Sequence, residues 1–292
     1  MLIKIILYHT ILKSTSNYMG KNKLHMVGKK TKRKKKKKLT KKDKKGIIDV
    51  PIARELSQGS KASLGDINYH YQKYYNTFAF LKEIINKNKK LKNLVCIPNV
   101  GQGWMQSFLK LHFFKGMSTS SVQSLKPVDT ANSKNKFIEG IDRCMDHRLV
   151  PISLEIIVPG AGTHANVIII DTKKKTVELF EPHGNRSVKS ELESISRAYF
   201  KVSKNVQRFF SMYLPDFTYI PPSEYEPKSG LQARLDAFSG LCVTWSILYL
   251  HYRVLNPDVH PKKIITYLDK KVSKNFLLRY TKYVEDVLKH KA

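Results

Sequence analysis

The chain has 292 residues, of which 41% are hydrophobic and 10% aromatic, enough apolar material to bury a substantial core. Its 53 Lys and Arg residues against 23 Asp and Glu give a formal net charge of +30. This composition excludes a chain that is disordered throughout, and the charge indicates anionic partners.

The positive charge is concentrated near the N-terminus. Residues 29–45 contain 13 Lys and Arg and one Asp, a net charge of +12, which leaves +18 for the rest of the chain. Residues 1–48 are of low complexity and bury little apolar surface, so we expect a disordered basic arm. Because no aromatic residues alternate with the lysines, DNA or RNA would bind through its phosphates without sequence preference. A solvated tail or a localisation signal is the alternative.

The N-terminus begins with a short apolar run, "MLIKIILYHTILK", that is interrupted by Lys4 and by a polar "YHT". No small-residue cleavage site follows, and the run is too short to cross a bilayer. We therefore expect neither a secretion signal nor a membrane segment.

The three cysteines, Cys96, Cys144 and Cys242, are odd in number and widely spaced. No CxxC motif and no histidine pair at zinc-ligand spacing accompanies them. The sequence therefore predicts a reducing compartment, no disulfide and no metal, with Cys144 as an ordinary core residue on an apolar helix stripe.

The first half of the folded part has mainly helical patterns. A helix is expected within residues 66–96, where "FAFLKEIINKNKKLKNLVC" has a solvated lysine face. "WMQSFLKLHFF" from Trp104 is interpreted as another helix, and "NSKNKFIEGIDRCMDHR" as a third. Residues 49–148 are thus expected to form a mainly helical region, a candidate substrate-binding subdomain.

The pattern then changes from helical to strand-like. Residues 149–158, 164–171 and 176–182 are rich in β-branched residues and bounded by turn sequences, which predicts a meander. Residues 190–214 are amphipathic with a Ser190 cap, and "DFTYIPP" is a short strand that ends at a double proline. From Leu241 the chain is helical, with breaks at "NPD" and Pro261. This order predicts an α+β fold.

Polar residues stand where the predicted hairpin would accept apolar ones. A four-residue "TKKK" loop pairs Asn166 with Glu181 and His164 with His183, so all four side chains share one face. Glu181 is then within reach of His164, and a carboxylate bonded to an imidazole is the orienting half of a nucleophilic triad. A bulge or three-residue loop would break this pairing, and Asp171 is the alternative orienting acid.

The candidate nucleophile is Cys242, which follows Gly240 and opens an apolar helix of about three turns. A helix N-terminus stabilises a thiolate, and an adjacent imidazolium lowers the thiol pKa further. Gln232 lies ten residues upstream, and its amide could donate to an oxyanion together with the Cys242 backbone N–H. The competing interpretation makes Cys242 and His164 core residues and Glu181 a surface carboxylate.

The order of these residues resembles that of a known family. His164, an acid 17 residues later on the next strand, then Gln232, then Gly-x-Cys at the start of a buried helix is similar to the Ulp1-like cysteine proteases. These include the SUMO and ubiquitin-like proteases and the adenovirus-type endopeptidase. "FEPHG" and "GLCVTWSILYLHYRVLNP" look closer to the thiol proteases predicted in mimivirus and other large DNA viruses. The resemblance covers about residues 150–258.

The resemblance implies a central mixed sheet flanked by helices, with residues 149–292 as the catalytic core. It makes His164 the general base, Glu181 its orienting acid, Gln232 the oxyanion donor and Cys242 the nucleophile, with no cofactor. The implied function is a cysteine endopeptidase that processes virion or ubiquitin-like protein substrates. The implied location is the virion or a viral factory in the host cytoplasm.

Three departures from the SUMO proteases bear on substrate recognition. Ala165 stands where those enzymes have an aromatic residue, Leu241 stands where they usually have Asp or Ser, and the interval from Gln232 to Cys242 is longer. Two other functions stay open. One is acyl transfer from acetyl-coenzyme A on the same scaffold, as in the bacterial effector acetyltransferases that the sequence also resembles. The other is a basic nucleic-acid-binding virion protein on a degenerate protease fold.

Overall fold

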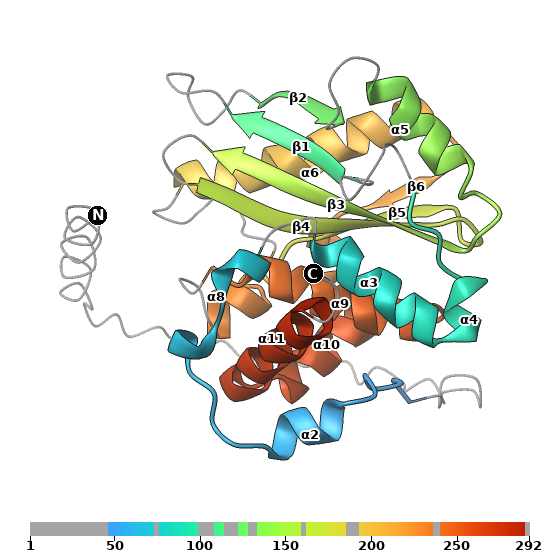
Figure 1. Ribbon diagram of the computed structural model, residues 1–292. Helices are drawn as coiled ribbons and strands as arrows, with labels where there is room; N and C mark the ends of the chain where they lie inside the picture. Colours follow the sequence, from blue (N-terminus) through green and yellow to red (C-terminus); the bar gives the residue numbers. More distant parts are fainter. Residues whose placement is uncertain are drawn as a thin grey trace, which may run out of the picture. The chain divides into compact units, whose positions relative to one another are not determined.

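The computed structural model describes residues 46–72, 76–98, 108–113, 122–127, 133–158, 162–184, 193–235 and 240–289, all within one compact unit, Gly46–Ala292 (Figure 1). The expected basic arm comprises residues 1–48. Residues 1–45 of it lie outside the described ranges, so its disorder stays a prediction. Ile48 already belongs to the fold, because its backbone N–H and C=O both bond the side-chain amide of Asn256.

A single mixed sheet of six strands forms the centre of the fold. Its strands are β1 (Phe108–Phe113), β2 (Val122–Pro127), β3 (Leu149–Val158), β4 (Gly162–Asp171), β5 (Thr176–Phe180) and β6 (Thr218–Ile220), in the spatial order β2-β1-β3-β4-β5-β6. β1 is parallel to β3 and β5 is parallel to β6, whereas the other neighbours are antiparallel. The predicted α+β class with a central mixed sheet is confirmed.

Helices cover both faces of the sheet (Figure 1). One core joins a face of the sheet to α2 (Ala53–Gln58), α3 (Asn76–Lys87), α4 (Lys89–Lys92), α9 (Cys242–Leu255), α10 (Pro261–Lys271) and α11 (Lys274–Lys289). The other core holds α5 (Ser133–Asp142) and α6 (Glu193–Tyr213). Successive side chains of β4 point to opposite faces of the sheet, so the strand contributes to both cores: Val167 lies in the first and Ile168 in the second.

Short segments connect these layers. The 3-10 helices η2 (Leu64–Asp66) and η3 (Tyr69–Tyr71) precede α3, and α7 (Pro222–Tyr225) and α8 (Leu231–Leu235) lie between β6 and α9. None of the helices within the described ranges is long and apolar enough to cross a membrane. The same ranges contain no cluster of three or more His, Cys, Asp or Glu side chains suited to a metal ion.

The helix expected from Trp104 is wrong in its described part. Residues 108–113 form β1, which pairs in parallel with β3, and Trp104 itself lies outside the described residues. The physical reason is visible in "FLKLHF", where apolar and polar residues alternate with the period of two that a strand requires. Residues 49–148 therefore supply two strands to the sheet of the C-terminal region, and their role in substrate binding stays a prediction.

The later elements follow the expected pattern closely. β3 has the predicted bounds, β4 begins two residues earlier than predicted, and β5 ends at Phe180, two residues before the predicted end. α6 ends at Tyr213, although its expected cap Ser190 lies outside the described residues. Helices α9 and α10 are separated at the predicted break, since α9 ends just before "NPD" and α10 begins at Pro261, whereas the break between α10 and α11 at residues 272–273 was not predicted.

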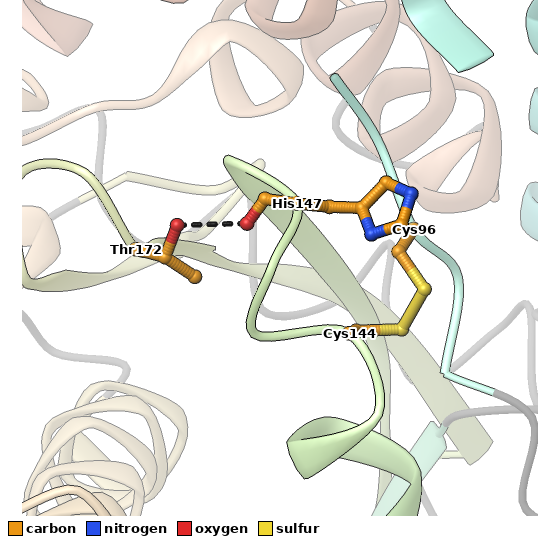
Figure 2. Close-up of a disulfide and its surroundings, with 4 residues drawn as sticks. All are labelled: Cys96, Cys144, His147 and Thr172. Carbon is orange, nitrogen blue, oxygen red and sulfur yellow. Dashed lines mark hydrogen bonds between the residues drawn. A yellow bond between two sulfur atoms is a disulfide. The ribbon is translucent and has the colours of Figure 1, made fainter. Parts of the chain in front are cut away.

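The prediction of no disulfide is wrong, because Cys96 and Cys144 are bonded (Figure 2). The segment after α4 is held against β3 by two backbone hydrogen bonds, from Cys96 N to Leu149 O at 3.0 Å and from Leu149 N to Leu94 O at 2.9 Å. This brings Cys96 to Cys144 just beyond α5, with Cα atoms 5.4 Å apart. A separation of 48 residues hid the pairing, and the inference of a reducing compartment loses its basis.

The disulfide should stabilise the native state when it is intact. We expect replacement of both Cys96 and Cys144 by serine to lower the free energy of unfolding by about 2–4 kcal/mol, because the bridge restricts the unfolded chain over a long loop. Urea unfolding with and without a reductant measures this. The reductant should bring the wild type down to the double variant and leave the variant unchanged; equal stabilities without reductant would contradict the bond.

Candidate active site

The β4–β5 hairpin has the register that the sequence predicts. Its loop is the four residues 172–175, and Val167 pairs with Phe180 while Asp171 pairs with Thr176. Continued by one residue, this register places Asn166 opposite Glu181 at the open end of the hairpin. The polar residues of the two arms therefore meet on one face, as the alternation of strand side chains requires.

The carboxylate of Glu181 is held from several sides. Its Oε1 lies 2.7 Å from Nε2 of His164, and its Oε2 accepts a 2.5 Å hydrogen bond from the Asn166 amide. The backbone N–H of His183 also donates to Oε1, at 2.9 Å, and the His183 ring lies 4.9 Å from the His164 ring between centroids. Glu181 is buried, and His164 is 9% exposed. The sequence predicted that these residues would face one another, but not that Asn166 would bond the acid.

Asp171, the alternative orienting acid, lies at the other end of β4. It is seven residues from His164, roughly 23 Å along an extended strand. Its side chain forms ion pairs with Arg148 at 3.5 Å and Arg253 at 3.9 Å. The geometry therefore joins Glu181, and not Asp171, to the His164 imidazole.

Cys242 is the first residue of α9, where the sequence placed it. Gly240, two residues earlier, has φ of 74°, in the left-handed region that favours glycine. The Cys242 thiol is within hydrogen-bonding reach of the His164 side chain and of the Ala165 backbone. Because Nε2 of His164 faces Glu181, the other ring nitrogen is left for the sulfur. With Cys96 and Cys144 bonded to each other, Cys242 is the free cysteine of the three, and it is partly exposed.

The electrostatics of these groups favour a thiolate–imidazolium pair. Burial opposes a charged imidazole, but the Glu181 carboxylate and the Cys242 sulfur outweigh it and raise the pKa of His164. Burial likewise opposes the thiolate, yet the hydrogen bond and charge of His164 lower the pKa of Cys242. For Glu181, burial is again outweighed by His164, so its pKa is lowered. All three shifts stabilise the charged forms.

Helix α9 is fixed on the hairpin by polar side chains at successive turns. After Cys242, Ser246 donates to the Ala165 carbonyl at 3.2 Å, and the Tyr249 hydroxyl donates to Glu178. Residues 242, 246 and 249 share one face of the helix because they are spaced by four and three residues. The Cys242 thiol, at the start of this helix, is therefore positioned by the contacts of the next two turns with the hairpin.

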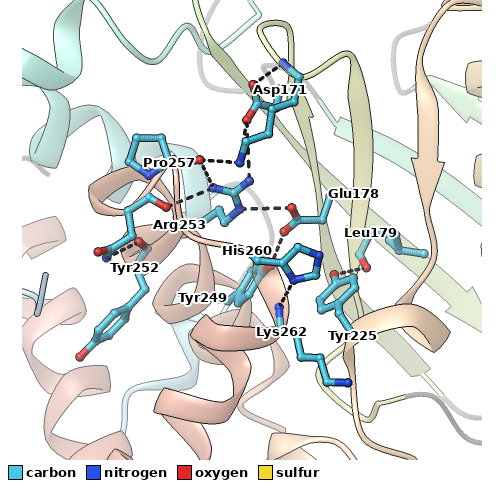
Figure 3. Close-up of polar contacts among 12 residues, drawn as sticks. Asp171, Glu178, Leu179, Tyr225, Tyr249, Tyr252, Arg253, Pro257, His260 and Lys262 are labelled. Carbon is cyan, nitrogen blue, oxygen red and sulfur yellow. Dashed lines mark hydrogen bonds and ion pairs between the residues drawn. The ribbon is translucent and has the colours of Figure 1, made fainter. Parts of the chain in front are cut away.

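The far end of α9 carries a buried ion pair (Figure 3). Arg253 is 1% exposed, and its Nε lies 3.1 Å from Glu178 Oε2 on β5. The same guanidinium reaches Asp171 on β4 and the carbonyl oxygen of Pro257 beyond the helix. The sequence analysis missed this network, although Arg253 in an otherwise apolar helix was a signal for it.

Gln232 is the second residue of α8, beside the segment that carries Glu181. Its backbone N–H donates to the Pro182 carbonyl at 2.9 Å, and the N–H of Gly230 donates to the His183 carbonyl at 2.8 Å. The two backbones approach so closely that a Cβ on Gly230 would lie 2.2 Å from the Gly184 nitrogen. The Gln232 residue is 2% exposed, and its side-chain carbonyl oxygen has no hydrogen-bond partner.

Comparison with known proteins gives weak similarities. No family model matches the chain. A mimivirus protein, "Putative ankyrin repeat protein L371" of Acanthamoeba polyphaga mimivirus, is 25% identical over 185 residues, which are 55% of this chain. The chain spans 23% of that relative's length. The relative is named for ankyrin repeats and not for a thiol protease, so the predicted kinship with viral thiol proteases stays a proposal.

Solved structures with some similarity to the chain include a bacterial effector and a SUMO protease. Two structures of ChlaDUB1, an effector of Chlamydia trachomatis, have TM-scores of 0.38 and 10% identity, covering 82% and 80% of this chain and 89% and 97% of theirs. The SUMO protease Ulp1, with its catalytic cysteine oxidised to a sulfinic acid, has a TM-score of 0.29 and 14% identity, covering 86% of this chain and 98% of its own. Similarities of this size carry no argument about function.

The charge pair can be tested without a substrate. In the wild type, alkylation of Cys242 by iodoacetamide should persist below the ordinary thiol range, because His164 lowers the thiol pKa. Glu181→Gln removes the anion that raises the His164 pKa, so the imidazolium is lost at a lower pH and the thiol pKa rises. We therefore expect the alkylation midpoint to move to higher pH, with a rate at pH 6 lowered about tenfold or more.

Asp171→Asn is the matched control, since it removes a carboxylate from the strand that carries His164, at the end far from the imidazole. It should leave the alkylation profile in place. A larger shift in Asp171→Asn than in Glu181→Gln would show that the orienting acid has been assigned to the wrong end of β4.

Proposed function

We propose that this protein is a cysteine peptidase with Cys242 as nucleophile, His164 as general base and acid, and Glu181 as the orienting carboxylate. The observation that supports it most is the continuous contact from Glu181 through the His164 imidazole to a free, partly exposed thiol at a helix N-terminus. A carboxylate that fixes one imidazole nitrogen leaves the other to activate the nucleophile.

The reaction follows from the positions of these groups. The Cys242 thiolate would attack the carbonyl carbon of a peptide or isopeptide bond, and His164 would give its proton to the leaving amine. The backbone N–H groups at the start of α9 would stabilise the oxyanion, since Leu241 provides no side-chain cap for them. Gln232, which is buried ten residues before Cys242 in the chain, is proposed as the second donor through its side-chain NH2 group. Water activated by His164 would then release the acyl group.

The proposed substrates are proteins, of virion or ubiquitin-like type. The order of His164, Glu181, Gln232 and Cys242 supports this class through its resemblance to the Ulp1-like proteases. The mimivirus origin of the sequence relative agrees with a viral setting, and we propose the virion or a viral factory as the location.

Cys242→Ala should abolish turnover while leaving the melting temperature within a few degrees of wild type, because it removes one sulfur at a partly exposed position. Ubiquitin and SUMO C-terminal fluorogenic amides, together with peptides from virion proteins, provide the assay. The Cys96 and Cys144 double serine variant is the control and should retain activity when folded. Turnover that survives in Cys242→Ala would remove the peptidase proposal.

The same preparation separates the enzyme alternatives. Incubation with radiolabelled acetyl-coenzyme A would label an acyltransferase at Cys242 and then its protein acceptor. A chain that hydrolyses the amides and takes no label is a peptidase. One that does neither, and whose Cys242 reacts only as an ordinary thiol, fits the basic virion protein.

We further propose that the basic arm binds DNA or RNA through phosphates. If about six of the 13 Lys and Arg at residues 29–45 neutralise phosphates together, log K should fall with log salt at a slope near −5, a loss of about 10³-fold between 50 and 200 mM. Deleting residues 1–45, which spares the contact of Ile48 with Asn256, should reduce this slope and leave peptide hydrolysis unchanged. Equal affinity and slope in the truncated chain would identify a passive tail or a localisation signal.

A further inference from the structure

The acid of the proposed site lies where β5 loses its neighbouring strand. β6 has three residues and pairs with Thr176, Val177 and Glu178 of β5. It ends at Ile220 because the double proline that follows has no backbone N–H groups to continue a ladder. The backbone N–H and C=O groups on that edge of the chain between Leu179 and Glu181 therefore need other hydrogen-bond partners.

Side chains from the end of α7 supply these partners. The Tyr225 hydroxyl donates to the Leu179 carbonyl, as Figure 3 shows, and Oε1 of Glu226 accepts the Glu181 backbone N–H at 2.9 Å. Alternate residues of a strand direct their backbone groups to the same edge, so the two contacts extend the β5–β6 ladder past the prolines. Tyr225 is 3% exposed and Glu226 8%, so water does not compete freely for either contact.

We propose that Glu226 is a positioning residue, which holds the Glu181 backbone in strand geometry so that the Glu181 carboxylate reaches the His164 imidazole. This inference rests on the proposed function. The Glu226 side-chain oxygen bonds the Glu181 backbone N–H, so this contact fixes the position of the Glu181 backbone. Asn166 and His183, by contrast, bond the Glu181 carboxylate itself. Without the Glu226 contact, the Glu181 backbone N–H, the first beyond β5, would lose its acceptor, and the Gly184 N–H bond to the Glu181 carbonyl at 2.8 Å would remain.

The chemistry of Glu226 agrees with this role. Burial, together with the nearby Glu181 and Glu178 carboxylates, raises its pKa well above the ordinary value, although the Glu181 N–H opposes the change. The shift favours the neutral carboxyl form, in which the oxygen that accepts the Glu181 N–H is a carbonyl oxygen. A glutamine has the same length and the same acceptor, so it should replace Glu226 well. Leucine has similar bulk and no acceptor.

The experiment compares Glu226→Gln with Glu226→Leu in the full chain. The readout is the pH profile of Cys242 alkylation by iodoacetamide, measured well below each melting temperature. We expect the alkylation rate of Glu226→Gln at pH 6 to stay within about threefold of wild type. The rate of Glu226→Leu at pH 6 should fall about tenfold, because the midpoint of its pH profile moves to higher pH. Glu224→Leu, at an exposed position two residues earlier on α7, is the control and should change nothing.

Two results would overturn the inference: a Glu226→Leu profile that matches wild type, or a Glu226→Gln profile displaced as far as Glu226→Leu. If the leucine variant does not fold, Glu226→Asp takes its place, because the shorter side chain withdraws the acceptor and should shift the midpoint in the same direction. A wild type without low-pH alkylation would refute the thiolate–imidazolium pair, and with it the proposed function. A normal wild type with unshifted Glu226 variants would refute the positioning role alone.

Discussion

The hydrogen bond between His164 Nε2 and Glu181 Oε1 requires that β4 and β5 keep one particular register. A slip by one residue would turn Glu181 to the opposite face, where Phe180 now stacks on Tyr249 of α9 at 4.1 Å between ring centroids. The apolar residues of both arms resist this slip, because each would exchange one buried face for the other. The register of the proposed acid and base is therefore enforced by the hydrophobic core.

The nucleophile depends on the same hairpin through a different set of contacts. α9 crosses it with Cys242 beside His164 at one end and Arg253 between Glu178 and Asp171 at the other. Burying an ion pair has a desolvation cost that can match its attraction, so this one is weak grounds for stability. Its directional bonds to two strands can instead specify where the helix lies along the hairpin. That function is consistent with a site in which the thiol must meet the imidazole within hydrogen-bonding reach.

The sequence predicted the features that short-range patterns encode. The four-residue "TKKK" loop and the alternation of its arms gave the register, and the Gly240 turn before an apolar run gave the position of Cys242. It failed where the deciding partner is remote in the chain. The disulfide joins residues 48 apart in the chain. Glu226 falls in the same class, since no local pattern shows that "PPSEYE" will meet the end of β5.

Three buried carboxyl groups near this hairpin have different partners, and the partners set their roles. Glu178 faces the Arg253 guanidinium, Glu181 faces the His164 imidazole, and Glu226 faces a backbone N–H. Only the first two have a cationic partner, whereas burial and the neighbouring carboxylates raise the pKa of Glu226 and favour its neutral form. A second anion beside Glu181 would be costly in this environment. Glu226 can therefore support the Glu181 backbone at close range, while the Glu181 carboxylate faces His164.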